Sequence, residues 1–519
     1  MLTMFRSATS ERAGYSFRVC AAAQISVPVL NFSLSLSHIP VFSWRGCSWA
    51  SITHGGSLVF SRCVALDVIF RRTERTSERT RPMRQLTKVM YSVVEKWFVV
   101  VALLYFLSAV LELLRNPEHL VNTDTQASDT FNLVLQIGIY VFALLFMSPI
   151  LGRVWKAMLM NPVLLSLLGL VLASSLWSEV HFFTFRRGII LVATTLFGFY
   201  FATRYDNGEQ LRLVAYALSV CAVLSVVFIV AAPRYGFDTG LGRHSDSFRG
   251  VFLQKNILAH SMVIGILTWF CLRPRKIGEA ILKYLMIVTM LGLVIGSLSA
   301  GSYAMMIICI LLIFLYRVVR LYQGRSLVPV AVGIGTALLL GAIVARINQE
   351  AILRILGRSS SLTGRVPMWR ALLVKVSERP WLGYGFRGFW STQSRGIWSL
   401  IHWKPVVAHN GYLDLTLELG LVGLGFFALT SIIVARRCIT QALVGRNLEA
   451  QWPLLMLSQL LLYNLFESTL LVPNNFSWVI YAAITVSTQR AWQTKKNVAS
   501  VGITDAPPLS TMERFPCPQ

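Results

Sequence analysis

The amino-acid sequence predicts an all-α fold, a polytopic bundle of transmembrane helices. Hydrophobic residues make up 55% of the 519 residues and charged residues only 14%, whereas a soluble domain carries about 25% charged residues. The mean hydropathy is +0.61, and the apolar residues gather in blocks that approach the ~20 residues needed to cross the core of a bilayer. This composition excludes an ordinary soluble enzyme, and it excludes intrinsic disorder, which requires low hydrophobicity and high charge.

The apolar blocks, read in order along the chain, give about 12 candidate spans, with a large external loop at about residues 346–410 between spans nine and ten. Each block is apolar over most of the length of a membrane-crossing helix. The blocks are residues 97–114, 131–150, 162–177, 187–203, 211–232, 256–272, 281–297, 301–316, 327–345, 411–434, 453–471 and 474–490.

The two ends of the chain differ from this bundle in composition. Residues 1–82 are rich in Ser and Arg and poor in acidic residues, as in a solvated segment. We predict a disordered N-terminal extension or a gene model that begins too early, with Met83 or Met90 as a more natural start. The transmembrane domain is then residues 83–492, and residues 493–519 form a disordered cytoplasmic tail.

The basic residues alternate from loop to loop. The formal net charge is +25, which in a soluble protein would suggest a nucleic-acid partner. In a membrane protein, short cytoplasmic loops collect Lys and Arg, and every second loop of this chain is basic if its N-terminus is cytoplasmic. We therefore expect no nucleic-acid partner and place loops 115–130, 233–255 and 346–410 outside. The basic residues expected inside are Arg153, Lys156, Arg204, Arg273, Arg275, Lys276, Lys283, Arg317, Arg320, Arg325, Arg436, Arg437, Arg446, Lys495 and Lys496.

The external loop 346–410 has the composition of a folded cap. It contains five Trp residues, which favour a segment that packs against the membrane surface. A helix is predicted to open at Thr363-Gly364-Arg365 and to end at Arg379-Pro380, followed by a turn-rich segment. Its predicted apolar face consists of Trp369, Leu372, Leu373 and Val376.

The signatures of nucleotide, serine and zinc hydrolysis are missing from the sequence. It contains no Walker sequence, no GxSxG elbow and no HExxH helix, and its eight Cys show no CxxC spacing. We therefore predict no metal site and no cofactor. The remaining candidates for catalysis and substrate binding are polar residues of the external segments.

His409 stands where the long loop enters span ten, in the string His409-Asn410-Gly411-Tyr412-Leu413-Asp414. A neutral imidazole can accept a proton from a hydroxyl near pH 7. Alternatively, His409 anchors the helix end while Asn410-Gly411 supplies the turn. Glu418 lies further inside the span, where a carboxylate should face the protein interior. Asn410 and Glu418 are candidates for substrate binding, or for orienting a partner.

Arg249 and Arg365 are both predicted to be external. Their guanidinium groups suit phosphate oxygens, and two of them could hold a pyrophosphate. Arg243, Lys255 and Asn256 lie near Arg249 in the sequence and add charge and hydrogen-bond donors. For each of them, contact with a lipid headgroup is the alternative.

The other external charges are expected to have structural roles. Glu179 and Arg186-Arg187 could join the site or pair with each other, and Glu467, near the outer end of span eleven, is another buried carboxylate that needs a partner. Structural pairing is favoured for all of them. Arg387 and Arg395 are expected at the surface.

Several of these strings resemble the O-antigen ligase and polysaccharide polymerase superfamily, especially its exopolysaccharide polymerase branch. The likeness covers about residues 97–490, in the order and topology of that family. The strings are Leu176-Trp177-Ser178, Phe248-Arg249-Gly250-Val251-Phe252, Lys255-Asn256, Thr363-Gly364-Arg365 with Trp369, Arg379-Pro380-Trp381-Leu382-Gly383-Tyr384-Gly385, His409-Asn410-Gly411-Tyr412-Leu413, Glu418-Leu419-Gly420 and Glu467-Ser468.

The resemblance implies a GT-C-like glycosyltransferase of the bacterial inner membrane with its active site on the periplasmic side. It implies a donor sugar on undecaprenyl diphosphate, a glycan acceptor, membrane lipids and a chain-length regulator as partners, and no nucleotide or required metal. Arg249 and Arg365 resemble the arginines that hold the diphosphate, and His409 resembles the residue near the acceptor hydroxyl. The chain departs from the family at Tyr303, where relatives often place an Arg.

Two function classes stay open at this point. The first is an inverting, metal-independent enzyme that joins lipid-linked repeat units, with a polymerase favoured over an O-antigen ligase that transfers finished glycan to a lipid A core. The second is a transporter of lipid-linked oligosaccharides. Transporters often contain paired half-repeats with broken helices near the midplane, and no matching halves are found in this sequence.

Overall fold

The computed structural model describes six stretches of the chain, and within them the chain is helical. The only β pairing among the described residues is an isolated bridge between Phe237 and Phe248. The predicted all-α fold is therefore confirmed. Residues 1–82, the ninth predicted span at 327–345 and the first part of the predicted external loop lie outside the described residues. The described stretches are residues 89–109, 130–238, 247–321, 365–399, 404–445 and 447–504.

Seven of the described helices are long and apolar enough to cross a membrane, and three shorter apolar helices accompany them. With α19, these helices coincide with eleven of the predicted blocks, so the predicted polytopic membrane architecture is confirmed. The seven are Val89–Phe106, α3 (Thr130–Met147) continued by α4 (Leu151–Leu159), α6 (His181–Arg204), α7 (Asn207–Ala231), α10 (Ile277–Gly296), α11 (Ala300–Leu321) and α17 (Gly411–Val444). The shorter helices are α5 (Pro162–Ala173), α9 (Lys255–Cys271) and α18 (Trp452–Tyr463).

Helix α19 (Phe476–Thr504) packs against α6, α17 and α18. The close approach to α6 depends on Gly198, since a Cβ there would stand 2.7 Å from the Cβ of Ala482. Small residues allow helix backbones to approach in this way in membrane proteins. Trp478 is fully buried, and its indole N–H donates to Thr195 Oγ1 at 2.9 Å. The helix continues past residue 492 to Thr504, so the first part of the predicted disordered tail is helical.

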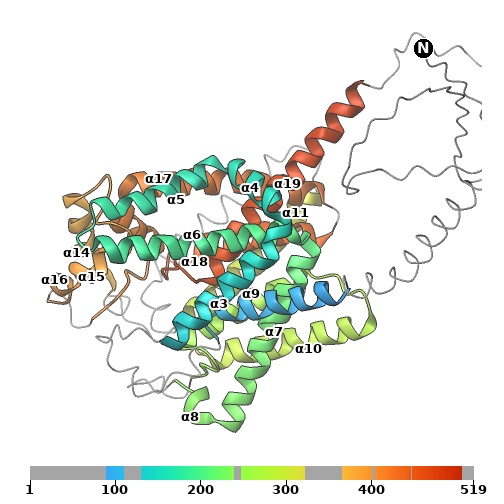
Figure 1. Ribbon diagram of the computed structural model, residues 1–519. Helices are drawn as coiled ribbons and strands as arrows, with labels where there is room; N and C mark the ends of the chain where they lie inside the picture. Colours follow the sequence, from blue (N-terminus) through green and yellow to red (C-terminus); the bar gives the residue numbers. More distant parts are fainter. Residues whose placement is uncertain are drawn as a thin grey trace, which may run out of the picture. The chain divides into compact units, whose positions relative to one another are not determined.

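Charged residues join the helices at one end of the bundle. Arg212 in α7 bonds Glu279 in α10 at 3.1 Å, and the backbone N–H of Arg273 donates to Glu449 before α18. These contacts bring the α6–α7, α9–α10 and α17–α18 connections to the same end, as the alternation of basic loops predicts. The opposite end carries α14 (Arg365–Glu378), α15 (Phe389–Thr392) and α16 (Ser394–Trp398), which gather beside the start of α17 (Figure 1).

Helix α14 confirms the predicted cap helix, with one correction to its buried face. Met368 and Leu372 are fully buried, whereas Leu373 is 58% exposed. The predicted face placed Leu372 and Leu373 together, but consecutive residues of a helix point about 100° apart, and the buried stripe passes through Met368 instead. The turn-rich segment after the helix is also confirmed, with positive φ at Gly383 and Gly385.

The cap, here the described residues 365–399, packs into a break in α17. Gly420 has φ 66° and ψ −168° inside the helix, and a Cβ there would lie 2.1 Å from the carbonyl oxygen of Trp381. Backbone groups released by the break pair with the cap: Tyr384 N–H donates to Leu417 O at 2.8 Å, and Leu421 N–H donates to Pro380 O at 2.8 Å. Irregular backbone in a spanning helix is tolerated where protein buries and satisfies it. The break thus fixes the cap rigidly beside the start of α17.

The string Leu176-Trp177-Ser178 binds the other side of the cap. The indole N–H of Trp177 donates to the carbonyl of Leu382 at 3.1 Å. A Cβ on Gly385 would stand 2.5 Å from the Cβ of Ser178, so only glycine fits between cap and helix end at this position. The cap is therefore held between the end of α5 and the start of α17.

Candidate functional site

The Glu467 carboxylate joins two of the predicted site residues. Its Oε2 lies 2.9 Å from His409 Nδ1, and its Oε1 lies 3.3 Å from Arg365 Nη2. Arg365 Nη1 also donates to the carbonyl of Phe466 at 2.7 Å. The three side chains are 17–23% exposed, so they are partly desolvated but open to a ligand. The structure thus brings Arg365 and His409 together through a residue that the sequence suggested only for structural pairing.

Hydrogen bonds between the turn before α17 and the turn after α18 position His409 against Glu467. The backbone N–H of Gly411 donates to the carbonyls of Asn464 and Glu467, at 2.8 and 3.1 Å, and Asn410 N–H donates to Ser468 Oγ. A Cβ on Gly411 would stand 2.2 Å from Asn464 Oδ1. Only glycine therefore allows this approach, which explains the Asn-Gly step after His409.

Asn464 shapes the turn that carries Glu467. Its side chain is fully buried, and its Oδ1 accepts the backbone N–H groups of Thr469 and Leu470, at 2.7 and 3.1 Å. Its amide nitrogen donates to Leu460 O and Thr469 Oγ1, each at 2.8 Å. Because the side-chain amide is satisfied on both sides, the turn after α18 is rigid.

Asp414 anchors the backbone immediately before His409. Both of its carboxylate oxygens accept the Ala408 N–H, at 3.0 and 3.1 Å. The indole of Trp390 donates to the same carboxylate at 2.7 Å, and the Trp369 indole donates to Ala408 O at 2.8 Å. Two cap aromatics therefore fix Ala408, so that His409 can hold its positive φ of 48°. Asp414 belongs to the predicted string, but its spacing alone carried no signal for this role.

Two of the predicted substrate-binding residues make hydrogen bonds within the protein. Asn410 caps α17, because its Oδ1 accepts the N–H groups of Tyr412 and Leu413, both at 3.1 Å. Asn256 Oδ1 accepts the hydroxyl of Ser299 at 2.9 Å, which ties α9 to the turn between α10 and α11. Lys255, also predicted to bind substrate, is the first residue of α9.

Glu418, the remaining described candidate for substrate binding, faces the cap. It is 5% exposed, its carbonyl accepts the N–H of Gly385, and its Oε1 lies 4.0 Å from Arg387 Nε. Arg387, expected at the surface, is thus half-buried, because the break in α17 brings it to this carboxylate. Arg395 is exposed, as predicted.

Arg249 makes no described contact with the Arg365–Glu467–His409 group. Its Nε donates to the carbonyl of Tyr235 at 3.0 Å, and its backbone N–H donates to Gly236 O. These bonds hold it beside the end of α7. Arg243 lies outside the described residues.

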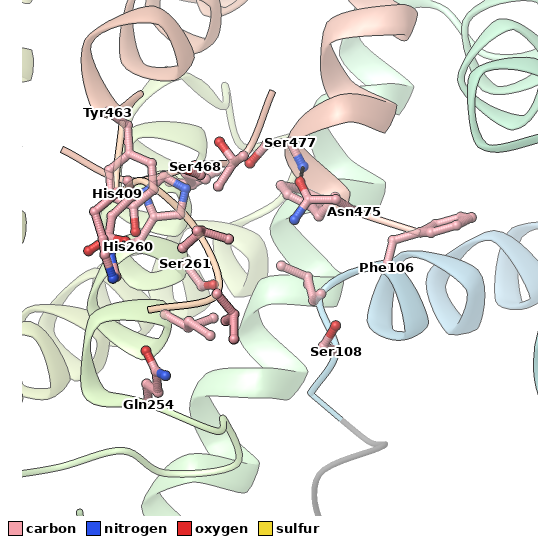
Figure 2. A pocket seen from close by; sticks show the side chains of 18 of the residues that line it. Phe106, Ser108, Gln254, His260, Ser261, His409, Tyr463, Ser468, Asn475 and Ser477 are labelled. Carbon is pink, nitrogen blue, oxygen red and sulfur yellow. Dashed lines mark hydrogen bonds and ion pairs between the residues drawn. The ribbon is translucent and has the colours of Figure 1, made fainter. Parts of the chain in front are cut away.

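A cavity of about 420 Å³ opens beside His409 and Glu467. Figure 2 shows Tyr463, His409 and His260 on one side of it, and Asn475, Ser477 and Phe106 on the other. Within the described part of the chain, no group of three or more His, Cys, Asp or Glu side chains could hold a metal ion.

Comparisons with known proteins agree with the predicted resemblance. Residues 285–428 match a family model described as O-antigen ligase; this region contains Arg365 and His409. The chain is also 25% identical over 232 residues to a protein of Rickettsia bellii (strain RML369-C) named as a candidate polysaccharide ligase. That match covers 43% of this chain and 54% of the relative, so the chain spans about half the length of the curated relative it matches. The comparisons thus confirm the chain's resemblance to the O-antigen ligase and polysaccharide polymerase superfamily.

Proposed function

We propose that this membrane protein is a glycosyltransferase that moves an oligosaccharide from a lipid diphosphate, of the undecaprenyl type, to the hydroxyl of a glycan acceptor. The reaction takes place at the periplasmic face of the bacterial inner membrane. The observation that carries this proposal is the Glu467 carboxylate with one oxygen on His409 and the other on Arg365. It supports the proposal because a histidine that can act as a base lies beside an arginine that can bind a phosphate.

His409 acts as the general base in this proposal. With Glu467 accepting from Nδ1–H, Nε2 is the basic nitrogen of the neutral ring and takes the proton of the acceptor hydroxyl. Glu467 fixes the tautomer and stabilises the imidazolium that forms, as carboxylates beside catalytic histidines do. General base catalysis of this kind contributes about 10²–10⁴-fold.

Arg365 stabilises the leaving group. A guanidinium has five N–H donors, and the two described contacts leave others for phosphate oxygens. The acceptor oxygen bonds the anomeric carbon while the bond from that carbon to the phosphate oxygen breaks, and the proton passes to His409. Negative charge develops on the lipid diphosphate, and a pre-oriented cation favours that charge more than the ground state. One direct displacement inverts the anomeric carbon and needs no covalent sugar–enzyme intermediate.

The test is an assay of the purified full-length protein in detergent, with a lipid-linked oligosaccharide as donor. Wild type should form the product without a second compartment, a result that a transporter would not give. Arg365→Lys should largely abolish product while the protein stays folded, because a point charge replaces a two-pronged contact. Near-normal product from that variant would remove the diphosphate assignment. Arg249→Lys, assayed in parallel, tests whether the second predicted arginine contributes.

The acceptor distinguishes the two activities within this class, and we favour polymerase. Deletion of the gene in a strain with a defined surface glycan separates them. Short chains still attached to their final anchor indicate a lost polymerase, and full-length chains that accumulate on the carrier lipid indicate a lost ligase.

A further inference from the structure

The cavity beside His409 contains few charges. The residues that line it include two with opposite formal charges, Lys404 and Glu467, together with His260 and His409. Neither Arg249 nor Arg365 is among the described lining residues. A lipid diphosphate carries concentrated negative charge and requires cations around it, so the lining does not suit that group.

The rest of the cavity wall combines uncharged polar groups with apolar side chains such as Ile257 and Phe476. Gln254 at the start of α9, Ser108 after the first helix, and Asn475 and Ser477 at the start of α19 all line it. Figure 2 shows these side chains distributed around the space rather than gathered at one point. Its volume of about 420 Å³ falls in the range of small-molecule sites, about 300–1,000 Å³. Separated neutral donors and acceptors match a ring that carries several hydroxyl groups.

His260 is a buried polar residue of this wall, and only one of its two ring nitrogens is hydrogen-bonded among the described residues. It is 8% exposed, its ring stacks on Tyr463 at 3.5 Å between centroids, and its Nδ1 lies 2.9 Å from Gln459 Nε2. With that amide donating to Nδ1, the neutral ring carries its proton on Nε2. Within the described part of the chain, Nε2 has no hydrogen-bond partner. Buried polar groups are nearly always satisfied, so this N–H indicates a bound acceptor atom.

The two carboxylate oxygens of Glu467 face two different groups, so two substrates could approach it from different sides. Its Oε2 contacts His409, which lines the cavity, whereas its Oε1 contacts Arg365, which is not among the lining residues. A nucleophile in the cavity would therefore meet the base, and a phosphate at Arg365 would lie beyond the carboxylate.

We propose that this cavity is the acceptor subsite: it binds the neutral sugar whose hydroxyl is the nucleophile, and His260 Nε2–H donates to one of its oxygens. This inference rests on the proposed function and extends it, because it assigns the two substrates to different sides of Glu467.

The test measures KM for each substrate separately, with full-length protein in nanodiscs. The acceptor probe is a fluorescent oligosaccharide repeat unit released from the source organism's own surface glycan. Ile257→Trp, which fills the cavity, should raise KM for the acceptor at least about tenfold and leave KM for the donor within about twofold. Gln254→Ala should raise KM for the acceptor about threefold, as expected for the loss of one hydrogen bond. The side chain of Gln254 does not cap α9, so this variant tests binding without a change in folding.

His260→Phe keeps the stacking on Tyr463 and removes the proposed donor, so it should also raise KM for the acceptor alone. Val288→Phe is the matched control, because Val288 is 67% exposed on the outer face of α10. If the cavity variants raise KM for the donor instead, the space holds the donor and the inference is wrong.

Equilibrium binding of the same fluorescent oligosaccharide separates this inference from the proposed function. Wild type that forms no product but binds the oligosaccharide, with binding lost in Ile257→Trp, refutes the reaction and supports the subsite. Wild type that forms product while Ile257→Trp keeps both KM values supports the reaction and refutes the subsite. Wild type that fails to bind the oligosaccharide also refutes the subsite.

Discussion

Two arginine–carboxylate pairs at opposite ends of the bundle, Arg204–Glu95 and Arg365–Glu467, are built differently. Arg204 meets Glu95 through both Nε and Nη2, with three contacts between 2.7 and 3.0 Å. Tyr200 donates a further hydrogen bond to the same carboxylate at 2.7 Å, and Glu95 is 1% exposed. Every strong acceptor direction of that carboxylate is used within the protein, so the pair is closed.

The pair of Arg365 and Glu467 is open by comparison. It has a single contact of 3.3 Å between Nη2 and Oε1, and both side chains are about one-fifth exposed. The other carboxylate oxygen is occupied by His409. The Glu95 carboxylate is buried and fully bonded, so it would be costly to leave without its cation. The Glu467 carboxylate is one-fifth exposed, and its arginine keeps donors for a ligand. The two ends therefore predict opposite responses to mutation: loss of stability at Arg204, and loss of turnover at the Arg365–Glu467–His409 group.

The largest expected effect is that of His409→Ala. Removal of the base should lower kcat by about 10²–10⁴-fold with little change in KM for the donor, because Arg365 is untouched. Thermal unfolding should stay within the error of wild type. Steady-state kinetics with the lipid-linked donor check the first expectation, and unchanged turnover would make His409 a structural residue.

Arg204→Met should act on stability alone. It leaves the buried Glu95 carboxylate without its cation. Breaking a fully buried pair in this way costs about 3–5 kcal/mol, and the cost here should be smaller because the Arg204 side chain is 34% exposed. The thermal unfolding temperature in detergent should fall, while kcat of the protein that remains folded should match wild type. The paired variant Glu95→Gln/Arg204→Met should recover much of the loss, since no buried charge is left. A loss of turnover at full stability would contradict the assignment of this end as structural.

Glu467→Gln is expected to have an intermediate effect on turnover. Loss of the carboxylate that orients a catalytic histidine can cost up to about 10⁴-fold. Because Glu467 acts through His409, kcat should fall by no more than the about 10²–10⁴-fold expected for His409→Ala, while the fold is kept. The amide can still bond Arg365, so KM for the donor should change little. A stability loss as large as that of Arg204→Met would show that the site pair is structural, and the comparison between the two ends would fail.

The sequence predicted the elements whose signals are local. The helix that begins at Arg365 and ends before Arg379-Pro380 follows from apolar spacing and a proline stop, and α14 has those limits. The asparagine and glycine after His409 indicated a helix start, and Asn410 caps α17 there. These features depend on neighbours in the chain, so one sequence is sufficient to find them.

The sequence could not predict contacts between distant segments. Nothing local to Glu467 marks it as the partner of both Arg365 and His409, because a carboxylate near a span needs some partner but does not specify which. The break at Gly420 was hidden for the same reason: the surrounding residues read as one apolar span, and only the inserted cap segment explains the positive φ. The half-buried position of Arg387 follows from that insertion as well.

The smallest expected effect concerns the cap, at Glu378, and it depends on pH. The Glu378 carboxylate accepts from Lys375 Nζ at 2.8 and 2.9 Å and from the Tyr384 hydroxyl at 2.8 Å. These hydrogen bonds, that of Lys375 first, lower the pKa of Glu378 below its ordinary value. A lowered folded-state pKa stabilises the protein above the pKa of the unfolded chain, about 4.3, and this stabilisation disappears as the pH falls through the folded value.

Glu378→Gln should therefore lower the unfolding temperature slightly at pH 7, and this difference should shrink as the pH falls through the folded-state pKa of Glu378. The difference at pH 7 should correspond to less than about 1 kcal/mol, because the side chain is 45% exposed and solvent screens the pair. Thermal unfolding of both proteins across this pH range checks the sign. A difference in unfolding temperature that persists at low pH would mean that Glu378 supports the cap through packing rather than charge. The cap would then resemble the Arg204–Glu95 end of the bundle more than the Arg365–Glu467 pair.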